Sequence, residues 1–453
     1  KTRRSKMPIA LPLFRDPAEV EKIRASEKKR FNKDEDLVDR VIQLDCEWRT
    51  LQKDLDNAKK EKNIVSKLVG QKKKKKENAD VEQEQAKQLN IKVAELAKKV
   101  DEVKLALDKE LPKVGNLVHE SVVVSNDEDK DNEIVNTFGD ARSGEGLLPH
   151  HQVLWRIDGY EPERGSKAAG HRGYFLKGAG VMLNQALISY ALQFLTKKGF
   201  TPLQPPYFMN KDVMAGVAQL SQFDEELYHV KGSEGDEKYL IATSEQPLCA
   251  YHMGDWLNES ELPLKYAGMS TCFRKEAGKH GKDTWGIFRV HQFDKIEMFC
   301  ITAPDKSWEM HEQMRATAEE FLQSLGLPYQ VINIVSGELN LAAAKKYDIE
   351  AWFPVYGEYK ELVSCSNCLD YQSRAMETRI ADTTSKEKKY CHMLNSTLCA
   401  LTRTLSCIIE NFQEQDGVRV PEVLVPFMGG TTFLPYLREA REIKESKTKK
   451  GGK

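Results

Sequence analysis

Cationic, acidic and aromatic side chains recur at alternate positions in two short stretches between residues 271 and 299, TCFRKEAGKHGKDTWGIFRVHQFDKIEMF. Arg274 and Glu276 are two apart in the first stretch, and Arg289, His291, Phe293, Lys295 and Glu297 fall at odd positions of the second. Residues two apart in a β-strand point to the same side, so each stretch has a polar face. Guanidinium groups suit anions such as carboxylates and phosphates. The pattern therefore predicts either a ligand platform or a solvated surface.

A β-hairpin would present this face. The intervening AGKHGKDTWG contains three glycines, which favours a mobile connecting loop. Apolar side chains alternate with the polar set and predict a core on the opposite side of the sheet. They are Phe288, Val290, Ile296 and Met298.

A cysteine cluster is a second candidate for chemistry. Cys365 and Cys368 are spaced C-x-x-C, and Cys391 is followed by His392. Structural zinc sites take four such ligands, but no second C-x-x-C or H-x-x-x-H completes the set, so we predict that no zinc is required. The sequence also lacks a phosphate-loop spacing, a G-x-S-x-G elbow and a Rossmann glycine fingerprint.

An amphipathic repeat near the N-terminus predicts two long helices, because apolar residues recur at alternating spacings of four and three. The first run is Leu37, Val41, Leu44, Trp48, Leu51, Leu55 and Ala58, and the second is Ala86, Leu89, Val93, Leu96, Val100, Val103 and Leu107. Helices joined by a short turn run antiparallel, which gives a coiled-coil arm roughly 50 Å long. GQKKKKKENAD, with lysines 72–76, is interpreted as an exposed turn between them. A spacer or dimerisation coil is the simpler alternative.

Charge is distributed unevenly along the chain of 453 residues. Residues 1–115 carry 30 Lys and Arg against 22 Asp and Glu, a balance of +8, whereas the whole chain carries −1 and the remainder therefore −9. A basic appendage on a mildly acidic body predicts a polyanionic partner for the appendage. No apolar run approaches the roughly 18–20 residues that span a bilayer, so no membrane partner is expected. Nine cysteines without regular spacing indicate a reducing compartment, in keeping with a cytoplasmic location.

Beyond the predicted arm, long helical patterns mix with strand patterns, which is typical of an α+β fold. The polar stretch 124–133 marks a boundary, and residues 180–198 are predicted to form one helix closed by Gly199. We expect a coiled-coil arm over residues 1–118, an α+β body over 119–440 and a basic disordered tail over 441–453.

Five motifs in order behind the predicted arm resemble those of the seryl-tRNA synthetases of the cytosolic eukaryotic type, which are class II aminoacyl-tRNA synthetases. GFTPLQPP (residues 199–206) resembles motif 1, FRKE with RVHQFDKIE resembles motif 2, and LNSTLCALTRTLSCIIENFQ (residues 394–413) resembles motif 3. IATSEQP (residues 241–247) and ELVSCSN (residues 361–367) are two further signatures. Each is only moderately specific, but their joint order covers nearly the whole chain and is very specific.

The resemblance implies a fold and an activity. The fold is a class II synthetase antiparallel sheet flanked by helices, with an N-terminal antiparallel two-helix arm that binds tRNA. The activity is that of a serine–tRNA ligase. L-serine and ATP would give seryl-adenylate, and the seryl group would pass to the 3′ end of serine tRNA, with a selenocysteine tRNA left open as a second acceptor. The arm would contact the long variable arm of that tRNA, Pro206 would lie at a homodimer interface, and Mg²⁺ would accompany ATP.

The resemblance also implies roles for individual residues. The catalytic set would be Arg274, which contacts the α-phosphate and the serine carboxylate, Glu276 on the ATP side and Arg403 on the γ-phosphate. ATP would further meet Arg289, Val290, Phe293 (stacked on adenine), Glu361 and Ser364, the last two as Mg²⁺ ligands. Serine would be bound by Arg274 together with Thr243, Glu245, Glu297, Asn395 and Thr397.

One position departs from the family pattern. Many members have an arginine in the motif 2 loop where this chain has Trp285, so the resemblance gives Trp285 no role; its ring could stack on a terminal base. Lys279, His280 and Lys282 are candidates to meet the tRNA backbone. Two alternatives remain: a catalytically inactive synthetase-like RNA-binding factor, and a coiled-coil scaffold with an unrelated body.

Overall fold

The computed structural model describes residues 8–218, 226–232, 237–276, 285–381 and 389–441. The chain divides into two compact units. The first is Lys1–Val118 with Asn340–Ala342, and the second is His119–Leu339 with Ala343–Lys453. The expected tail, 441–453, lies outside the described residues except for Arg441.

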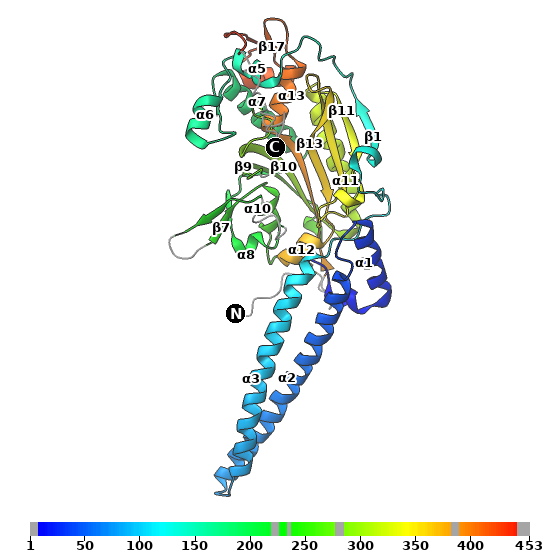
Figure 1. Ribbon diagram of the computed structural model, residues 1–453, viewed down its shortest axis with the longest axis vertical. Helices are drawn as coiled ribbons and strands as arrows, with labels where there is room; N and C mark the ends of the chain where they lie inside the picture. The colour runs from blue at the N-terminus through cyan, green and yellow to red at the C-terminus, as the bar shows by residue number, and fades with distance from the viewer. Residues whose placement is uncertain (1–7, 219–225, 233–236, 277–284, 382–388, 442–453) are drawn as a thin grey trace, which may run out of the picture. The chain divides into compact units, whose positions relative to one another are not determined.

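The first unit is helical. A 3₁₀ turn at Leu11–Arg15 precedes α1 (Pro17–Lys29), which begins here because the Asp16 side chain accepts a hydrogen bond from the Ala18 N–H. Helices α2 (Leu37–Lys74) and α3 (Asp80–Glu110) lie side by side as the predicted antiparallel pair (Figure 1). Half of the predicted apolar repeat is buried and the rest is half-buried; the buried members are Leu37, Val41, Leu55, Ala58, Leu89, Val100 and Leu107, and Val65 beyond the repeat is buried as well. The short η2 turn at Leu111–Lys113 then ends α3.

The turn between the two long helices lies later than the sequence suggested. Helix α2 continues through Gly70 to Lys74, and the chain reverses only after Lys75, with Lys76 at φ 56°. Lysine is a good helix former, and one exposed glycine costs a helix only about 1 kcal/mol, so the helix extends across both. At 1.5 Å per residue the 38 residues of α2 span roughly 57 Å.

An eight-stranded sheet dominates the second unit and confirms the predicted α+β fold. Its order is β1-β11-β12-β13-β16-β10-β9-β4. Every neighbouring pair is antiparallel except β4 with β9. The strands are β1 (Glu133–Phe138), β4 (Thr201–Leu203), β9 (Leu264–Phe273), β10 (Gln292–Thr302), β11 (Tyr329–Asn333), β12 (Lys345–Phe353), β13 (Glu358–Asn367) and β16 (His392–Ala400).

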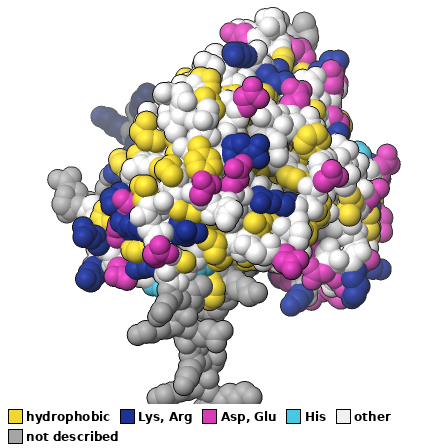
Figure 2. Space-filling view, turned by 90° about the horizontal axis from the view of Figure 1, so that it is seen from above, with side chains coloured by type: hydrophobic (Ala, Val, Ile, Leu, Met, Phe, Trp, Pro, Cys, Tyr) yellow, Lys and Arg dark blue, Asp and Glu magenta, His cyan; other side chains and the backbone are white. Residues whose placement is uncertain are grey.

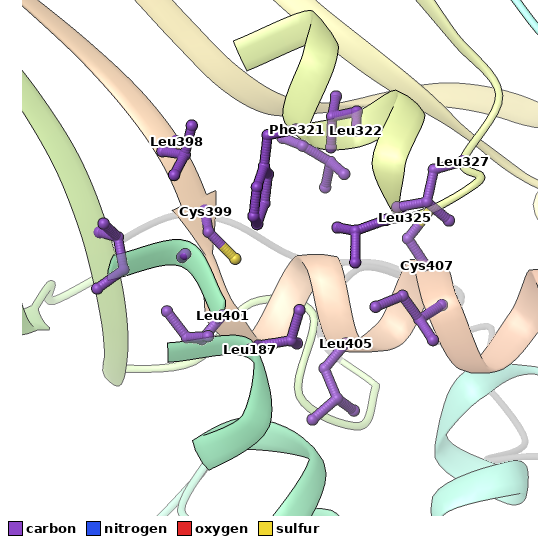
Figure 3. Close-up of a cluster of buried hydrophobic side chains, with 14 of the residues drawn as sticks. Leu187, Phe321, Leu322, Leu325, Leu327, Leu398, Cys399, Leu401, Leu405 and Cys407 are labelled. Carbon is purple, nitrogen blue, oxygen red and sulfur yellow. The ribbon is translucent and has the colours of Figure 1, made fainter. Parts of the chain in front are cut away.

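Three helices cover one face of the central strands: α7 (Ala179–Lys197), α11 (Ser307–Ser324) and α13 (Leu401–Asn411). Figure 3 shows how Leu187 of α7, Phe321 and Leu322 of α11, and Leu401 and Leu405 of α13 converge on one cluster. The apolar set predicted from the hairpin joins the same core: Phe288, Val290, Ile296 and Met298. Helix α7 is followed by Gly199 at φ 83°. This is the glycine that the sequence predicted to end the helix.

The opposite face of β10 is apolar at one end and polar at the other. Phe299 and Ile301 pack in a second buried cluster with Tyr266, Leu248 and Met393. Toward the start of the strand, Phe293, Lys295 and Glu297 occupy the same face, and Lys295 and Glu297 are only 6% and 2% exposed. Because these charges are buried, the solvated-surface alternative does not hold for them.

Smaller elements complete the second unit. The helices are α4 (Glu128–Asp131), α5 (His150–Arg156), α6 (Pro162–Ala169), α8 (Lys211–Met214), α10 (Glu245–Ala250) and α12 (Tyr371–Met376). The strands are β2 (Tyr160–Glu161), β3 (Phe175–Leu176), β5 (Phe208–Asn210), β6 (His229–Lys231), β7 (Glu237–Leu240), β8 (Trp256–Asn258), β14 (Arg379–Ala381), β15 (Lys389–Tyr390), β17 (Gly417–Arg419) and β18 (Phe433–Pro435). Among the described residues, no helix is both long enough and apolar enough to cross a bilayer.

Candidate active site

The hairpin β9–β10 carries the predicted platform, but its strands are shorter than the sequence suggested. β9 ends at Phe273 and β10 begins at Gln292, so Arg274, Glu276 and Arg289 lie just beyond the strand ends. One further backbone hydrogen bond, from the Arg274 N–H to the His291 carbonyl at 2.9 Å, continues the pairing. Glu276 then turns into the left-handed region at φ 49°, which ends the extended conformation. Lys279, His280 and Lys282 lie outside the described residues.

The three side chains at the strand ends form a cationic group with one acid. The Arg274 guanidinium lies 5.4 Å from the centre of the Phe293 ring, and its Nε donates to the Ala242 carbonyl at 3.3 Å. One Arg289 nitrogen donates to Glu276 Oε2 at 3.0 Å. A guanidinium held against an aromatic face by a backbone acceptor is pre-oriented for an anionic ligand.

Farther along β10, an acidic cluster lies on the same face. We use this name for Glu245 and Glu297 with the polar side chains around them: Lys295, Thr243, Asn395, Thr397 and Gln372. Lys295 Nζ is 2.6 Å from Glu297 Oε2. The hydroxyls of Thr397 and Thr243 approach the same oxygen at 3.4 and 3.5 Å.

An irregularity in strand pairing brings Thr397 to this face. Along β10 and β16, Ile296 pairs with Cys399 but Glu297 pairs with Thr397, so Leu398 has no partner in the register. Such a bulge adds one residue to one strand. Leu398 and Cys399 therefore both point into the core, as Figure 3 shows, while Thr397 meets Glu297.

Glu245, at the start of α10, is the second acid of the cluster. Its Oε1 accepts hydrogen bonds from Gln372 Nε2 at 2.7 Å and Asn395 Nδ2 at 2.9 Å. Burial raises the pKa of Glu245 to about 7, and the nearby Glu297 carboxylate adds to the rise. Two carboxylates this close suit a ligand that brings a positive charge.

A second acidic group lies where β12 and β13 pair, next to the first turn of α13. Arg403 donates to the Glu361 carbonyl at 3.0 Å and to its carboxylate at 3.3 Å. Desolvation opposes the charge of Glu361, but Arg403 and Lys346 outweigh it and lower its pKa. Asp348 lies opposite Ser364 in the register. Burial raises the pKa of Asp348 to about 7, although Lys346, 3.3 Å away, works against the rise.

This second group fits a hard cation. Asp348 Oδ1 is buried and has no hydrogen-bond partner among the described residues, and the side chains of Glu361 and Ser364 offer further oxygen atoms. Mg²⁺ prefers such oxygen ligands and keeps several waters. The chemistry of the donor set therefore suits Mg²⁺, with Asp348 as a ligand that the sequence did not single out.

Two predicted positions differ from the rest of the site. The Val290 side chain is 2% exposed and packs in the core, so only its backbone can meet a ligand. Trp285 is 47% exposed, its ring stands edge-on to His151 at 5.4 Å, and its carbonyl lies 3.1 Å from His150 Nε2.

The candidate zinc cysteines lie in the interior. Cys365, Cys368 and Cys391 are buried. In the described part of the chain, no group of three or more His, Cys, Asp or Glu side chains is arranged to hold a metal ion. The absence of a zinc requirement stays a prediction.

Sequence reasoning gave no role in the site to three residues of these groups: Lys295, which it placed only on the polar face of the hairpin, and Asp348 and Gln372, which it did not single out. For Lys295, the signal was its position two before Glu297 on the same strand face. Asp348 and Gln372 reach the site through strand register and helix packing, which short-range patterns do not contain. A cavity of about 410 Å³ also adjoins the hairpin and is lined in part by Arg172, Tyr228, Phe273 and His291. None of the predicted site residues lines it.

Comparison with known proteins identifies the family. Residues 9–118 match the seryl-tRNA synthetase N-terminal domain, and residues 228–412 match the tRNA synthetase class II core domain (G, H, P, S and T). A cytoplasmic serine–tRNA ligase of Dictyostelium discoideum is 55% identical over 424 residues, which cover 93% of each chain. This chain belongs to the seryl-tRNA synthetase family. The resemblance drawn from the motifs is thereby confirmed.

Further members and solved structures of the seryl-tRNA synthetase family agree over nearly the full length. The cytoplasmic serine–tRNA ligase of Saccharomyces cerevisiae is 52% identical over 95% of this chain and 96% of its own. The crystal structure of the Naegleria fowleri enzyme in complex with AMP has a TM-score of 0.83 at 46% identity, covering 95% of this chain and 99% of that one. The Pyrococcus horikoshii seryl-tRNA synthetase complexed with ATP gives a TM-score of 0.86 at 38% identity over 95% of this chain and all of that one.

Proposed function

We propose that this protein is a cytoplasmic serine–tRNA ligase. It activates L-serine with ATP to seryl-adenylate, releasing pyrophosphate, and transfers the seryl group to the 3′ end of serine tRNA. The observation that carries this proposal is the pairing, on one sheet, of a cationic group at Arg274 with the acidic cluster at Glu297. An amino acid needs both, because its carboxylate must meet a cation and its ammonium an anion.

Activation on this sheet needs no side-chain nucleophile. The serine carboxylate attacks the α-phosphorus of ATP, the bond to the β-phosphate oxygen breaks, and pyrophosphate leaves. Arg274 lies where it can hold both anions together, and Arg403, anchored on Glu361, can meet the γ-phosphate. Catalysis then consists of positioning the reactants and neutralising charge.

The nucleotide contacts extend along the hairpin. Phe293 offers its ring to adenine, with the backbone of Val290 beside it, and the Arg289–Glu276 pair holds the nucleotide side of the site. In the transfer step, the terminal ribose 3′-hydroxyl attacks the adenylate carbonyl and AMP leaves. Arg274, Glu276 and Arg403 are the catalytic residues of this proposal.

Serine recognition uses the acidic cluster. Glu245 and Asn395 would meet the ammonium group, and Glu297, Thr397 and Thr243 would surround the hydroxyl. A site built to pair a hydroxyl rejects an analogue that lacks one, because its own polar groups are then left unpaired. Alanine is rejected on this ground, and threonine for lack of room.

Mg²⁺ would be held by Glu361 and Ser364, with Asp348 as a further ligand. When bound, the ion would neutralise part of the charge on the phosphates. Glu361 contributes a carboxylate whose pKa is already lowered, so it stays ionised at neutral pH.

The proposed partners beyond the small substrates are serine tRNA and a second copy of the chain. The α2–α3 arm would contact the long variable arm of the tRNA, since lysines on an exposed coil suit a phosphate backbone. Pro206, in the motif 1 stretch, would lie at the homodimer interface. Figure 2 shows one face of the molecule on which Lys and Arg side chains alternate with acidic ones, so this face offers no continuous basic surface to RNA.

Pyrophosphate exchange with each of the twenty amino acids tests the activity. We expect ATP-dependent exchange with serine and with no other amino acid at a comparable rate. A folded protein that binds tRNA but exchanges nothing would instead be the inactive synthetase-like factor. The complete cationic and acidic complement around Arg274 and Glu297 argues against that alternative.

A further inference from the structure

The acidic cluster contains a cation that the proposed substrate recognition does not use. Lys295 is 6% exposed and its partner Glu297 is 2% exposed. Lys295 Nζ lies 2.6 Å from Glu297 Oε2 and 3.5 Å from Thr397 Oγ1. Burying a lysine is costly unless the charge is paired, so a lysine in this position needs a physical reason.

The geometry around Glu297 divides its two oxygens. Lys295, Thr397 and Thr243 all approach Oε2, at 2.6, 3.4 and 3.5 Å. Among the described residues, no hydrogen bond reaches Oε1. One oxygen is thus fixed by the protein, and the other remains as an acceptor for a ligand.

The charge count of the cluster also depends on Lys295. Two carboxylates, Glu245 and Glu297, lie together, and Glu297 is the neighbour that adds to the raised pKa of Glu245. The charged and titratable groups that face them are Lys295, Arg274 and the buried Cys272 thiol. If Arg274 is neutralised by the carboxylate of the amino acid, Lys295 is the one remaining cation of this set. One net negative charge then faces the incoming ammonium group.

We propose that Lys295 is a positioning and specificity-determining residue, which holds Glu297 by one oxygen and cancels its charge so that the site prefers a neutral side-chain hydroxyl over a second ammonium group. This inference rests on the proposed serine activation. The chemical competitor is 2,3-diaminopropionate, which has the size of serine and carries an ammonium group in place of the hydroxyl. Without Lys295, Glu297 would present an uncompensated carboxylate. Activation of the cationic analogue would then become more efficient, and activation of serine less efficient.

The test compares three variants in pyrophosphate exchange. Lys295→Met removes the charge at similar length, Lys295→Gln keeps a hydrogen-bond donor without the charge, and Lys295→Arg keeps the charge. The matched control is Lys265→Met on the neighbouring strand β9, whose ammonium lies 5.6 Å from the Phe200 ring. For each protein, kcat and KM are measured with serine and with 2,3-diaminopropionate, and thermal unfolding reports the fold.

We expect kcat/KM for serine to fall about 100-fold in the Met and Gln variants, because a close charge pair loses one member. The ratio of kcat/KM for 2,3-diaminopropionate to kcat/KM for serine should rise at least about tenfold. The Arg variant should retain the wild-type ratio, and the Lys265 control should match wild type. The Met and Gln variants should also lose serine activity at a higher pH than wild type, because two carboxylates without a cation share a proton more readily.

Two outcomes would overturn the inference. If the folded Gln variant keeps the wild-type ratio and pH profile, Lys295 serves only the fold. A Met variant that fails to fold leaves the decision to the Gln variant, which retains the donor. If the wild-type protein does not activate serine at all, the proposed function fails and this inference fails with it, so the two failures are distinguished by the wild-type measurement alone.

Discussion

The acidic cluster and the coiled-coil arm use the same residue types, lysine and glutamate, in opposite settings. In the cluster, the Lys295 and Glu297 side chains are 8% and 3% exposed and 2.6 Å apart. On the arm, Lys98 and Glu102 are 79% and 62% exposed and 3.8 Å apart. Removing one partner of a buried pair costs about 3–5 kcal/mol, whereas an exposed helical pair contributes about 0.3–0.5 kcal/mol.

This difference separates two kinds of recognition. The cluster stands on paired β-strands, so each charged atom has one position and can select among small ligands. The arm presents many exposed lysines on two helices, whose separate contributions are small and screened by salt. Charges of this kind sum to affinity for a polyanion and carry little selectivity for its sequence.

The largest expected effect comes from separating the two regions. With residues 35–111 replaced by a short linker, serine-dependent pyrophosphate exchange should remain, because every predicted activation residue lies at or after Thr243. Charging of tRNA should fall at least about 1000-fold at physiological salt, since many lysine–phosphate interactions disappear together. Charging that stays near the wild-type rate would show that the arm is only a spacer, and equal decreases in exchange and charging would show that the body needs the arm in order to fold.

A change inside the cluster should act on activation instead. Glu297→Gln keeps the shape of the side chain but removes the charged acceptor. We expect the loss of transition-state stabilisation to be about 2–3 kcal/mol, which is a decrease of about 30- to 150-fold in kcat/KM for serine. Affinity for tRNA, measured in parallel, should not change. A folded variant with near-normal exchange would remove Glu297 from the serine site.

The acidic limb of the pH profile should identify Glu245. Because its pKa is raised to about 7, the carboxyl is largely protonated below that pH and cannot accept an ammonium group. In this protein, kcat/KM for serine should therefore fall about tenfold per pH unit below 7. The pKa of Asp348 is also raised to about 7, so both carboxyl groups would be protonated in the same pH range. The Glu245→Gln variant shows which of the two causes the decrease in activity. If Glu245 is responsible, kcat/KM for serine in that variant should be low and should not change with pH below 7. If Asp348 is responsible, the decrease below pH 7 should remain in the variant.

The proposed metal site should respond to magnesium concentration. Glu361→Gln preserves the size of the side chain but removes one ligand charge. We expect the Mg²⁺ concentration for half-maximal exchange to rise about 5- to 10-fold, because a neutral amide is a weaker ligand for a hard cation. An unchanged magnesium titration would exclude Glu361 as a ligand. Lys306→Gln, an exposed change elsewhere in the second unit, is the control.

The smallest effect is expected at the turn of the arm. Replacing lysines 72–76 by glutamine should lower the slope of log affinity for tRNA against log salt by about 0.7–0.9 for each phosphate that a lysine no longer neutralises. Lys72 already pairs with Glu82, so it should contribute less than the four that follow. Binding at three salt concentrations, with exchange activity as the folding control, measures this slope. If the dependence of tRNA affinity on salt does not change, these lysines are only exposed to solvent and do not contact tRNA phosphates.

Sequence reasoning succeeded where a single stretch of chain contains the information. The heptad repeat predicted the antiparallel helices, and the alternation around Ile296 and Met298 predicted which side of β10 faces the main hydrophobic core. The end of α2 was predicted too early, because Gly70 reads as a breaker although an exposed helix tolerates it. The hairpin strands were predicted too long, because the left-handed turn at Glu276 has no signal in its residue type.

The remaining differences come from pairings between distant segments. Asp348 meets Ser364 only through the register of β12 with β13, and Gln372 reaches Glu245 from a separate helix. Register is decided by how whole strands fit together, so a local sequence pattern does not predict it. The roles of individual residues came from motif resemblance, which names positions but omitted the buried partner Lys295.

The unpaired Leu398 makes segment length a matter of function. Side chains of a strand alternate strictly, so shifting by one position exchanges the inward and outward sets. Because Ile296 pairs with Cys399 and Glu297 with Thr397, the alternation of β16 changes phase at Leu398. Deleting this one leucine would remove the bulge and leave Thr397 opposite Glu297 and Cys399 opposite Ile296, whereas an insertion or deletion of one residue between Asn395 and Thr397 would send one of these two side chains to the wrong face. We therefore expect this strand to tolerate a change of residue at position 398 better than an insertion or deletion between Asn395 and Thr397.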